Sequence, residues 1–217
     1  LSEIFLPNII ADFAKEHKDA QFYLKAQSSE RVHESIASQQ FDIGFAENPK
    51  NSELYLTKDF SLETMIALPD GHPLAKHQTL TPKNLDGVPI CTFLPEHYLT
   101  IKLRAAFESV DAKLNIPFFL QNSSAQYAIV ENGHAAGFMS LLSVWLYQQN
   151  RERSAKNKII FRPFLPLINQ NISLIIPKHR SLPQISQIFA EKLESSLHNI
   201  INLTNSGFQL GAAEELS

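Results

Sequence analysis

The sequence predicts an α/β protein built of two lobes. Helix-like and strand-like patterns alternate up to residue 68, and the alternation starts again at residue 89. Between the two series lies Asp70–Ile90, whose two glycines and three prolines are typical of a connection rather than of an element interior. We therefore expect the chain to leave one lobe and enter a second along this stretch. A chain of 217 residues is long enough to bury a core in each.

The first series contains two helices and four short strands. An i, i+3, i+4 pattern predicts a first helix that ends near Lys18, on Leu6, Ile9, Ile10, Phe13 and Ala14. Ser28 and Ser29 are suited to cap a second helix that turns Val32 and Ile36 inward. Strands are expected at Phe22–Ala26, Phe41–Ala46, Leu54–Phe60 and Thr64–Leu68. This order implies a parallel sheet with helices on its faces.

The second series repeats the alternation after the connection. Strands are expected at Pro89–Phe93, Pro117–Leu120, Ala135–Leu142, Ile159–Phe161 and Ile172–Ile176. A helix is expected on the apolar stripe Leu103, Ala106, Phe107, Val110 and Leu114. A second is expected to start at Ser123 or Ser124 and to run through Val130 to a C-cap at Asn132-Gly133. Two more are expected around Trp145 and from Ser181-Leu182-Pro183 onward. A return connection near Leu165–Ile172 divides the chain into lobe I (1–69 with 171–217) and lobe II (70–170).

The composition excludes several classes of protein. The apolar fraction is 44% and the net charge is −3, with no cluster of Lys or Arg, so the chain by itself is a poor nucleic-acid binder. Its single cysteine, Cys91, excludes a disulfide framework and lies in an apolar strand, where a buried inert thiol is expected. No apolar run approaches the ~20 residues of a membrane span, and no signal peptide opens the chain. The chain does not begin with Met, so we interpret it as a fragment of a longer protein.

Enzymatic chemistry is not supported by any motif. The sequence has no GxGxxG, GxxxxGK[ST], HExxH or GxSxG, and its eight histidines are scattered without a carboxylate partner at metal-ligand spacing. We therefore expect neither a metal site nor a cofactor. The alternative of an enzyme on the same scaffold would need a clustered acid, base or nucleophile.

A ligand site is better supported, because hydroxyl side chains recur at the expected helix starts. Parallel α/β sheets bind ligands beyond the carboxyl ends of their strands, where free N–H groups and the helix dipole favour an anion such as a carboxylate. Taken singly, each of these residues is also an ordinary N-cap, and only their recurrence in both lobes favours a site. The residues are Ser28, Ser29, Thr92, Thr100, Ser123 and Ser124.

Charged side chains also follow predicted strand ends. Glu47, Glu96 and His97 occupy such positions. Each reads alone as a solvated loop charge, whereas together they could hold a cationic group opposite the carboxylate.

Four strings, in matching order, resemble the effector-binding domain of LysR-type transcriptional regulators. FLPNIIADFAKEHKD looks like that family's first helix, and FDIGFA like its "DIGI" strand. The stretch DGHPLA…LTPKNLDGVPI matches "GHPLA … LT…L.G.P.I", and Ser123–Ser140 resembles "S…LV..G.GIA..P". Ala135 and Ser140 depart from the last pattern, so the local turn there is in doubt. FAENP looks most like the opine- and amino-acid-responsive members.

The resemblance implies two Rossmann-like lobes of the type 2 periplasmic-binding-protein kind, with an inducer in the cleft between them. It also implies a cytoplasmic homodimer or tetramer that binds DNA through an N-terminal helix-turn-helix domain absent from this sequence. Carried over by position, the inducer contacts would be Ser28, Ser29, Thr92, Ser123 and Ser124. The effector would bear a carboxylate, in the manner of an amino acid or opine. The alternative function is a transporter's solute-binding protein, which shares the fold.

The family's first strand has no counterpart before Leu1. The tail reads SGFQLGAAEELS, and Phe208–Ala213 looks like that strand, so we predict a circular permutation in which the tail fills the first-strand slot. Ser2, Ser217, Glu214 and Glu215 would then lie at the rim of the cleft and favour an effector with a cationic part. A strand from a neighbouring chain and a disordered polar tail are the alternatives.

Overall fold

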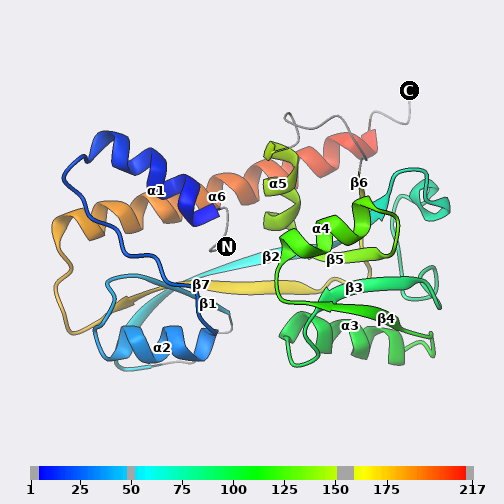
Figure 1. Cartoon of the computed structure of the whole chain (residues 1–217), viewed down its shortest axis with the longest axis horizontal. Coiled ribbons are helices and arrows are strands. Elements are labelled where there is room, and N and C mark those ends of the chain that lie inside the picture. Colours follow the sequence, from blue (N-terminus) through cyan, green and yellow to red (C-terminus); the bar gives the residue numbers. More distant parts are fainter. Residues whose placement is uncertain (1–4, 48–51, 151–158, 214–217) are drawn as a thin grey trace. The chain divides into compact units, whose positions relative to one another are not determined.

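The structure is a computed structural model that describes residues 5–47, 52–150 and 159–213, with side chains for 5–47, 52–149 and 159–202. The chain divides into two compact units (Figure 1). Unit 1 comprises Leu1–Ser61 and Asn171–Ser206, and unit 2 comprises Leu62–Gln170 and Gly207–Ser217. The chain passes from one unit to the other inside the strands β2 (Tyr55–Pro69) and β7 (Asn169–Pro177) and again near the end of the last helix, at Ser206–Gly207.

Unit 1 is a small sheet with helices on both faces. Its strands are ordered β1 (Gly44–Glu47), β7 and β2, and β1 runs antiparallel to β7. On one face α1 (Phe5–Glu16) packs against α6 (Gln184–Ala213), where the ring centroids of Phe13 and Phe189 are 5.0 Å apart. On the other face α2 (Ser29–Ala37) packs against β1 (Figure 1). Of the apolar stripes predicted for the first two helices, Phe13 and Ile36 are buried and the other members are half-buried.

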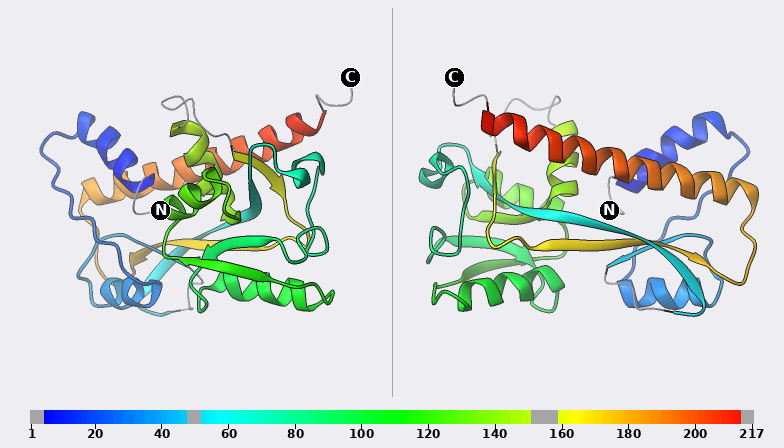
Figure 2. Two further views of the ribbon diagram at one scale, coloured as in Figure 1. Left: turned by 45° about the vertical axis from the view of Figure 1, so that its right-hand side comes forward. Right: turned by 180° about the vertical axis from the view of Figure 1, so that it is seen from behind.

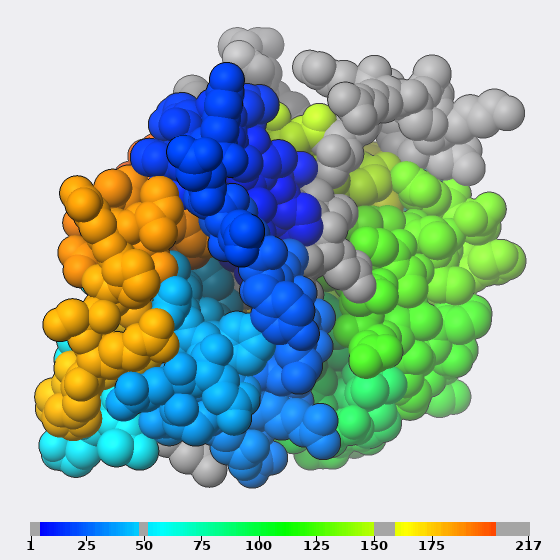
Figure 3. Space-filling view, turned by 60° about the vertical axis from the view of Figure 1, so that its left-hand side comes forward, coloured from blue at the N-terminus to red at the C-terminus, as the bar shows by residue number. Residues whose placement is uncertain are grey.

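The strand expected at Phe22–Ala26 is not formed. This segment runs over the surface of unit 1 as extended chain without a ladder partner among the described residues, with Tyr23 exposed (Figure 3). An apolar, alternating sequence satisfies the side-chain requirement for a strand, but a strand exists only when another strand accepts its backbone hydrogen bonds. The prediction of a parallel sheet in this lobe is also wrong, since β1 pairs with β7 in the antiparallel direction.

Unit 2 contains the parallel sheet. The middle strand β3 (Pro89–Phe93) is parallel to β4 (Asn115–Leu120) and to β5 (Ala136–Ser140). The second half of β2 is antiparallel to β5 and to β6 (Ile159–Pro163), which gives the order β6-β2-β5-β3-β4. The helices of this unit, with a short 3₁₀ turn, are η1 (Pro73–Lys76), α3 (Tyr98–Glu108), α4 (Ser123–Glu131) and α5 (Leu141–Asn150) (Figure 2).

Alternate residues of these strands serve two separate cores. Ile90 and Phe138 belong to the core that α3 covers, whereas their neighbours Cys91 and Met139 belong to the core beneath α4 and α5. This follows from the two-residue period of a strand, which points successive side chains to opposite faces. The second half of β2 and the strands β3 and β5 are buried on both faces and largely apolar, whereas β4 is partly exposed.

The Gly/Pro-rich stretch Asp70–Ile90 is part of unit 2 and does not connect the two units. Leu80 and Leu85 are fully buried in its core, and the backbone N–H of Leu80 donates to the carbonyl of Pro163 at 2.9 Å. The glycines still serve as turns, since Gly71 and Gly87 have φ of +76° and +71°. The sequence pattern located irregular backbone correctly, but buried leucines between the turns anchor it to the core.

The tail prediction is wrong. Phe208–Ala213 forms the last turns of α6 and not a strand, so no permuted first strand comes from it. Helix propagation adds one hydrogen bond per residue to a helix already nucleated at Gln184, and this favours continuation over a new strand. Two smaller differences concern boundaries: Leu54–Phe60 and Thr64–Leu68 are one strand, β2, and Ala135–Leu142 divides into β5 and the start of α5.

Candidate functional site

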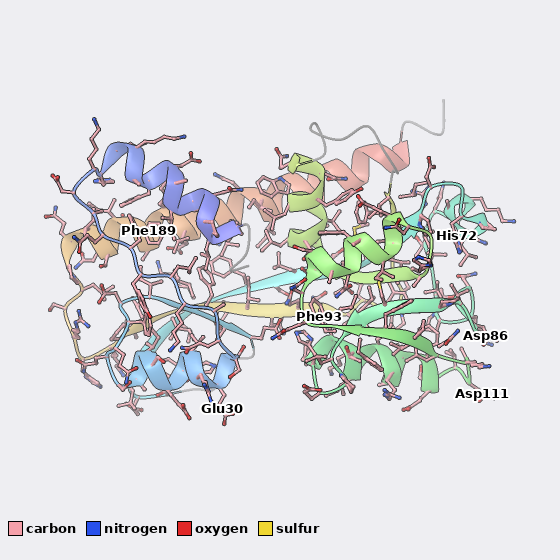
Figure 4. All side chains as sticks on the ribbon, in the orientation of Figure 1. Glu30, His72, Asp86, Phe93, Asp111 and Phe189 are labelled. Atoms are coloured by element: carbon pink, nitrogen blue, oxygen red, sulfur yellow. The ribbon has the colours of Figure 1, made fainter. Side chains whose placement is uncertain are left out.

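The carboxyl ends of the parallel strands of unit 2 define the candidate site. Strands β3, β4 and β5 run in the same direction and end at Phe93, Leu120 and Ser140. Helices α3, α4 and α5 begin just after these ends, at Tyr98, Ser123 and Leu141. Figure 4 labels Phe93 at this edge. Three helix starts thus follow one edge of one sheet, the arrangement in which α/β proteins bind ligands.

Helix α4 is capped by Asn122, so neither Ser123 nor Ser124 is its cap. The Asn122 side-chain oxygen accepts from the backbone N–H of Ala125 at 2.9 Å, with extended backbone at the cap (φ −146°, ψ 163°). Asn, Ser and Ser are all good caps, and the backbone geometry selects the first. Ser123 and Ser124 are therefore the first two helical residues, where helix N–H groups lack intrahelical acceptors.

A chain of hydroxyls links the starts of α4 and α5. The Ser123 and Ser143 hydroxyl oxygens are 2.9 Å apart, and those of Ser143 and Ser140 are 3.2 Å apart. The Tyr127 hydroxyl donates to the backbone carbonyl of Ser143, and burial raises the pKa of Tyr127 well above its usual value, so this donor stays protonated. The sequence prediction missed Ser143; Ser140 was noted only as a departure from the family pattern.

Thr92 and Thr100 form a buried pair. Both side chains are fully buried, their hydroxyl oxygens are 3.3 Å apart, and the Thr100 hydroxyl also hydrogen-bonds the carbonyl of Phe93 at 3.0 Å. These contacts fasten the end of β3 to the first turn of α3. The predicted residue Thr92 thus lies at this edge, and its hydroxyl is engaged in holding β3 and α3 together.

His97 and Glu96 lie at the start of α3. His97 is the N-cap: its Nδ1 accepts from the backbone N–H of Leu99 at 3.2 Å, and its ring stacks on Phe93 at 4.3 Å between centroids. Glu96 is exposed. Of the charged residues expected to meet a cationic group, His97 is occupied in capping and Glu96 faces solvent.

The predicted residues of unit 1 meet at the start of α2. The Ser29 hydroxyl accepts from the backbone N–H of Glu47 at 3.0 Å, which joins α2 to the end of β1. Ser28 occupies the N-cap position but its side chain makes no capping hydrogen bond. Ser2, Ser217, Glu214 and Glu215 lie outside the described residues.

Gln126 is a buried polar residue near this edge that was not predicted from the sequence. It lies in the first turns of α4, is fully buried, and neither its amide nitrogen nor its amide oxygen has a hydrogen-bond partner among the described residues. Its backbone carbonyl accepts a weak hydrogen bond from the Cys91 thiol, with 3.8 Å between sulfur and oxygen. The sequence alone offers no signal for this residue, because a single Gln beside Tyr127 is ordinary in a helix.

This edge carries no Lys or Arg and offers mainly hydrogen-bonding groups. Residues 94–100, 121–126 and 140–147 contain no Lys or Arg, so only N–H groups and hydroxyls there can receive an anion. Burial raises the pKa of the Cys91 thiol to about 12, which leaves it un-ionised. Within the described ranges no group of His, Cys, Asp and Glu is arranged to hold a metal ion. No helix there is long and apolar enough to cross a membrane.

Solved structures of similar fold are effector-binding domains of bacterial regulators. The CcmR regulatory domain of Synechocystis PCC6803, solved in complex with 2-PG, has a TM-score of 0.71 at 14% identity, with 90% of this chain and 92% of that one covered. The effector-binding domain of QuiR, solved with shikimate, has a TM-score of 0.64 at 16% identity, with 87% and 88% covered. These domains have the two-lobed periplasmic-binding-protein-like α/β fold, which confirms the predicted fold class.

The chain belongs to the LysR substrate binding domain family, whose model matches residues 1–197. It is 26% identical over 208 residues to the transcriptional activator protein LysR of Escherichia coli (strain K12), covering 92% of this chain and 62% of that protein. Over 87 residues it is 37% identical to the octopine catabolism/uptake operon regulatory protein OccR of Rhizobium meliloti, covering 40% of this chain and 29% of that protein. The chain thus spans less than two thirds of the length of these regulators.

Proposed function

We propose that this chain is the effector-sensing domain of a LysR-type transcriptional regulator, and that its effector is a small carboxylate of the amino-acid or opine kind. The observation that carries the proposal is the start of α4, where Ser123 and Ser124 follow the Asn122 cap at the carboxyl edge of the parallel sheet. Helix N-terminal N–H groups and the helix dipole favour an anionic group. The local similarity to a regulator of octopine catabolism and uptake supports the opine class.

The second half of the effector would be recognised by residues of unit 1. Ser29 and Glu47, which meet at the start of α2, supply a hydroxyl and a carboxylate. A carboxylate side chain there favours an effector whose far end carries an amino or guanidino group, as in basic amino acids and their opines. Glu96 of unit 2 would add to the same preference.

The parent protein would bind DNA through an N-terminal helix-turn-helix domain and act as a dimer or tetramer. The lengths of related regulators support this proposal, since the chain covers 62% of the transcriptional activator LysR of Escherichia coli. For effector sensing we propose two lobes, the first built on unit 1 and the second on unit 2.

Thermal unfolding over a ligand panel tests the proposal. The panel contains L-arginine, L-lysine, octopine, shikimate and 2-PG. A ligand that binds only the folded state stabilises it by RT ln(1 + [L]/Kd), about 2.7 kcal/mol at a hundredfold excess over Kd. We expect octopine or a basic amino acid to raise the unfolding midpoint. A midpoint unchanged by every carboxylate in the panel would refute the anionic site.

The Ser124→Ala variant locates the site. Because Ser124 is in the first turn of α4 and exposed, its removal is expected to weaken the ligand response without unfolding unit 2. Ser195→Ala, at an exposed position of α6, is the matched control and should respond to ligand as the wild type does. Equal ligand midpoints for the two variants would show that Ser124 is only a helix residue.

A further inference from the structure

The side chain of Gln126 is a buried polar group without a partner. Its exposed fraction is 0%, and both amide atoms lack hydrogen bonds among the described residues. An unsatisfied buried polar group typically costs a folded protein about 1–3 kcal/mol. An apolar residue of the same shape would avoid this cost, as Val130 does in the core beside it.

The position of Gln126 in the first turn of α4 favours an amide that covers the helix start. Side chains on a helix lean toward its N-terminus and cover the preceding turn, so residue 126 covers the turn that holds Asn122 and Ser123. The backbone at 126 is itself fixed, because its N–H donates to the Asn122 carbonyl and its carbonyl meets the Cys91 thiol. By this rule we expect the amide to cover the same helix start to which we assign the effector's carboxylate.

We infer that Gln126 is a specificity-determining residue that binds the group next to the effector's carboxylate. The inference rests on the proposed function. A primary amide offers two N–H donors and a carbonyl acceptor, so it can donate to the carboxylate and accept from an amino or hydroxyl group on the adjacent carbon. The ligand class is therefore a 2-amino or 2-hydroxy acid rather than a plain carboxylate.

Substitution of Gln126 by Met gives a test that does not depend on the ligand. Met is unbranched, close to Gln in shape and similar in helix propensity. If the amide is unsatisfied, Gln126→Met should raise the unfolding midpoint of the ligand-free domain by about 2–4 °C. A lower midpoint, or failure to fold, would mean that the amide has an internal partner and would overturn the inference.

Ligand pairs give the second test. L-arginine is compared with 5-guanidinopentanoate, and L-lysine with 6-aminohexanoate, each pair differing only in the 2-amino group. The wild type should bind the amino acid at least about tenfold more tightly than its partner, and Gln126→Met should remove that preference. Gln126→Glu, which places a carboxylate against the effector's own, should abolish binding. Gln149→Met, at an exposed position of α5, is the control and should behave as the wild type.

The outcomes separate this inference from the proposed function. If the wild type responds to an amino acid and Gln126→Met keeps both its affinity and its preference, the inference is wrong while the proposed function stands. If the wild type responds to no carboxylate in either panel, the proposed function fails and the inference fails with it.

Discussion

The hydroxyl of Ser29 and the backbone N–H of Glu47 are joined by a hydrogen bond of 3.0 Å, although 18 residues separate them in the chain. The contact ties the first residue of α2 to the last residue of β1. It joins two residues of the proposed effector site across two neighbouring elements, and it also contributes to the stability of unit 1.

Ser29→Ala should lower the free energy of unfolding by about 1 kcal/mol, because it removes one partly buried hydrogen bond. Ser28→Ala is the matched control, since the neighbouring serine makes no capping hydrogen bond and should cost less. Denaturant titration of both variants measures the difference. Equal losses would show that the bond to Glu47 contributes nothing.

Gly44→Ala should destabilise unit 1 by about 1–3 kcal/mol through overpacking. A Cβ at residue 44 would lie 2.7 Å from Cγ1 of Val32 and 2.9 Å from Cγ1 of Ile36, and both are β-branched side chains with little rotamer freedom. The double variant Gly44→Ala/Val32→Ala should lose less than the sum of the two single changes. Additive losses in this double-mutant cycle would exclude the clash with Val32 as the cause.

The Cys91 thiol should be unreactive in the folded protein. Burial raises its pKa to about 12, and only the thiolate is nucleophilic. Iodoacetamide at about pH 8 should alkylate it much more slowly in buffer than in denaturant. Mass spectrometry of the two reactions checks this, with Cys91→Ser as the blank. Similar rates in both would mean that the thiol is accessible in the folded state.

Stability should fall as the pH falls below about 6.5, the ordinary pKa of histidine, because of His72. Burial lowers the pKa of this side chain, whose Nδ1 accepts from the Leu74 N–H at the start of η1 and must be unprotonated to do so. The unfolded state then binds a proton more readily than the folded state does. The stability that His72 contributes is therefore fully present above the pKa of the unfolded state, and it is lost as the pH falls toward the lower pKa of the folded state. Unfolding measured against pH should show a smaller slope in His72→Asn. An identical slope would assign the loss to other groups.

Elements that depend on local signals were predictable from the sequence. Strand β3 has the predicted bounds, because a short apolar run is enclosed by Gly87 and by the Leu94-Pro95 turn. The end of α4 was equally clear, since Gly133 adopts the left-handed backbone (φ +74°) that a helix C-terminus often requires.

Features that depend on distant partners were not predictable. Phe22–Ala26 has the pattern of a strand, and only the absence of a ladder partner among the described residues shows otherwise. The tail is ambiguous for another reason: Phe208 and Leu210 fit the two-residue period of a strand, whereas the long helix that begins at Gln184 decides their conformation. Likewise, Asn122, Ser123 and Ser124 are equally good caps by composition, and φ and ψ select Asn122.

The absence of Lys and Arg from residues 94–100, 121–126 and 140–147 has a consequence for how sensing responds to the medium. Ionic strength screens attraction between full charges, with a Debye length of about 8 Å at physiological salt, but it has little effect on short hydrogen bonds from N–H groups and hydroxyls. Binding of the carboxylate end should therefore depend on salt less than binding of the cationic end, which Glu47 and Glu96 would hold by full charge, so rising salt should weaken the response to a basic effector mainly through that cationic end.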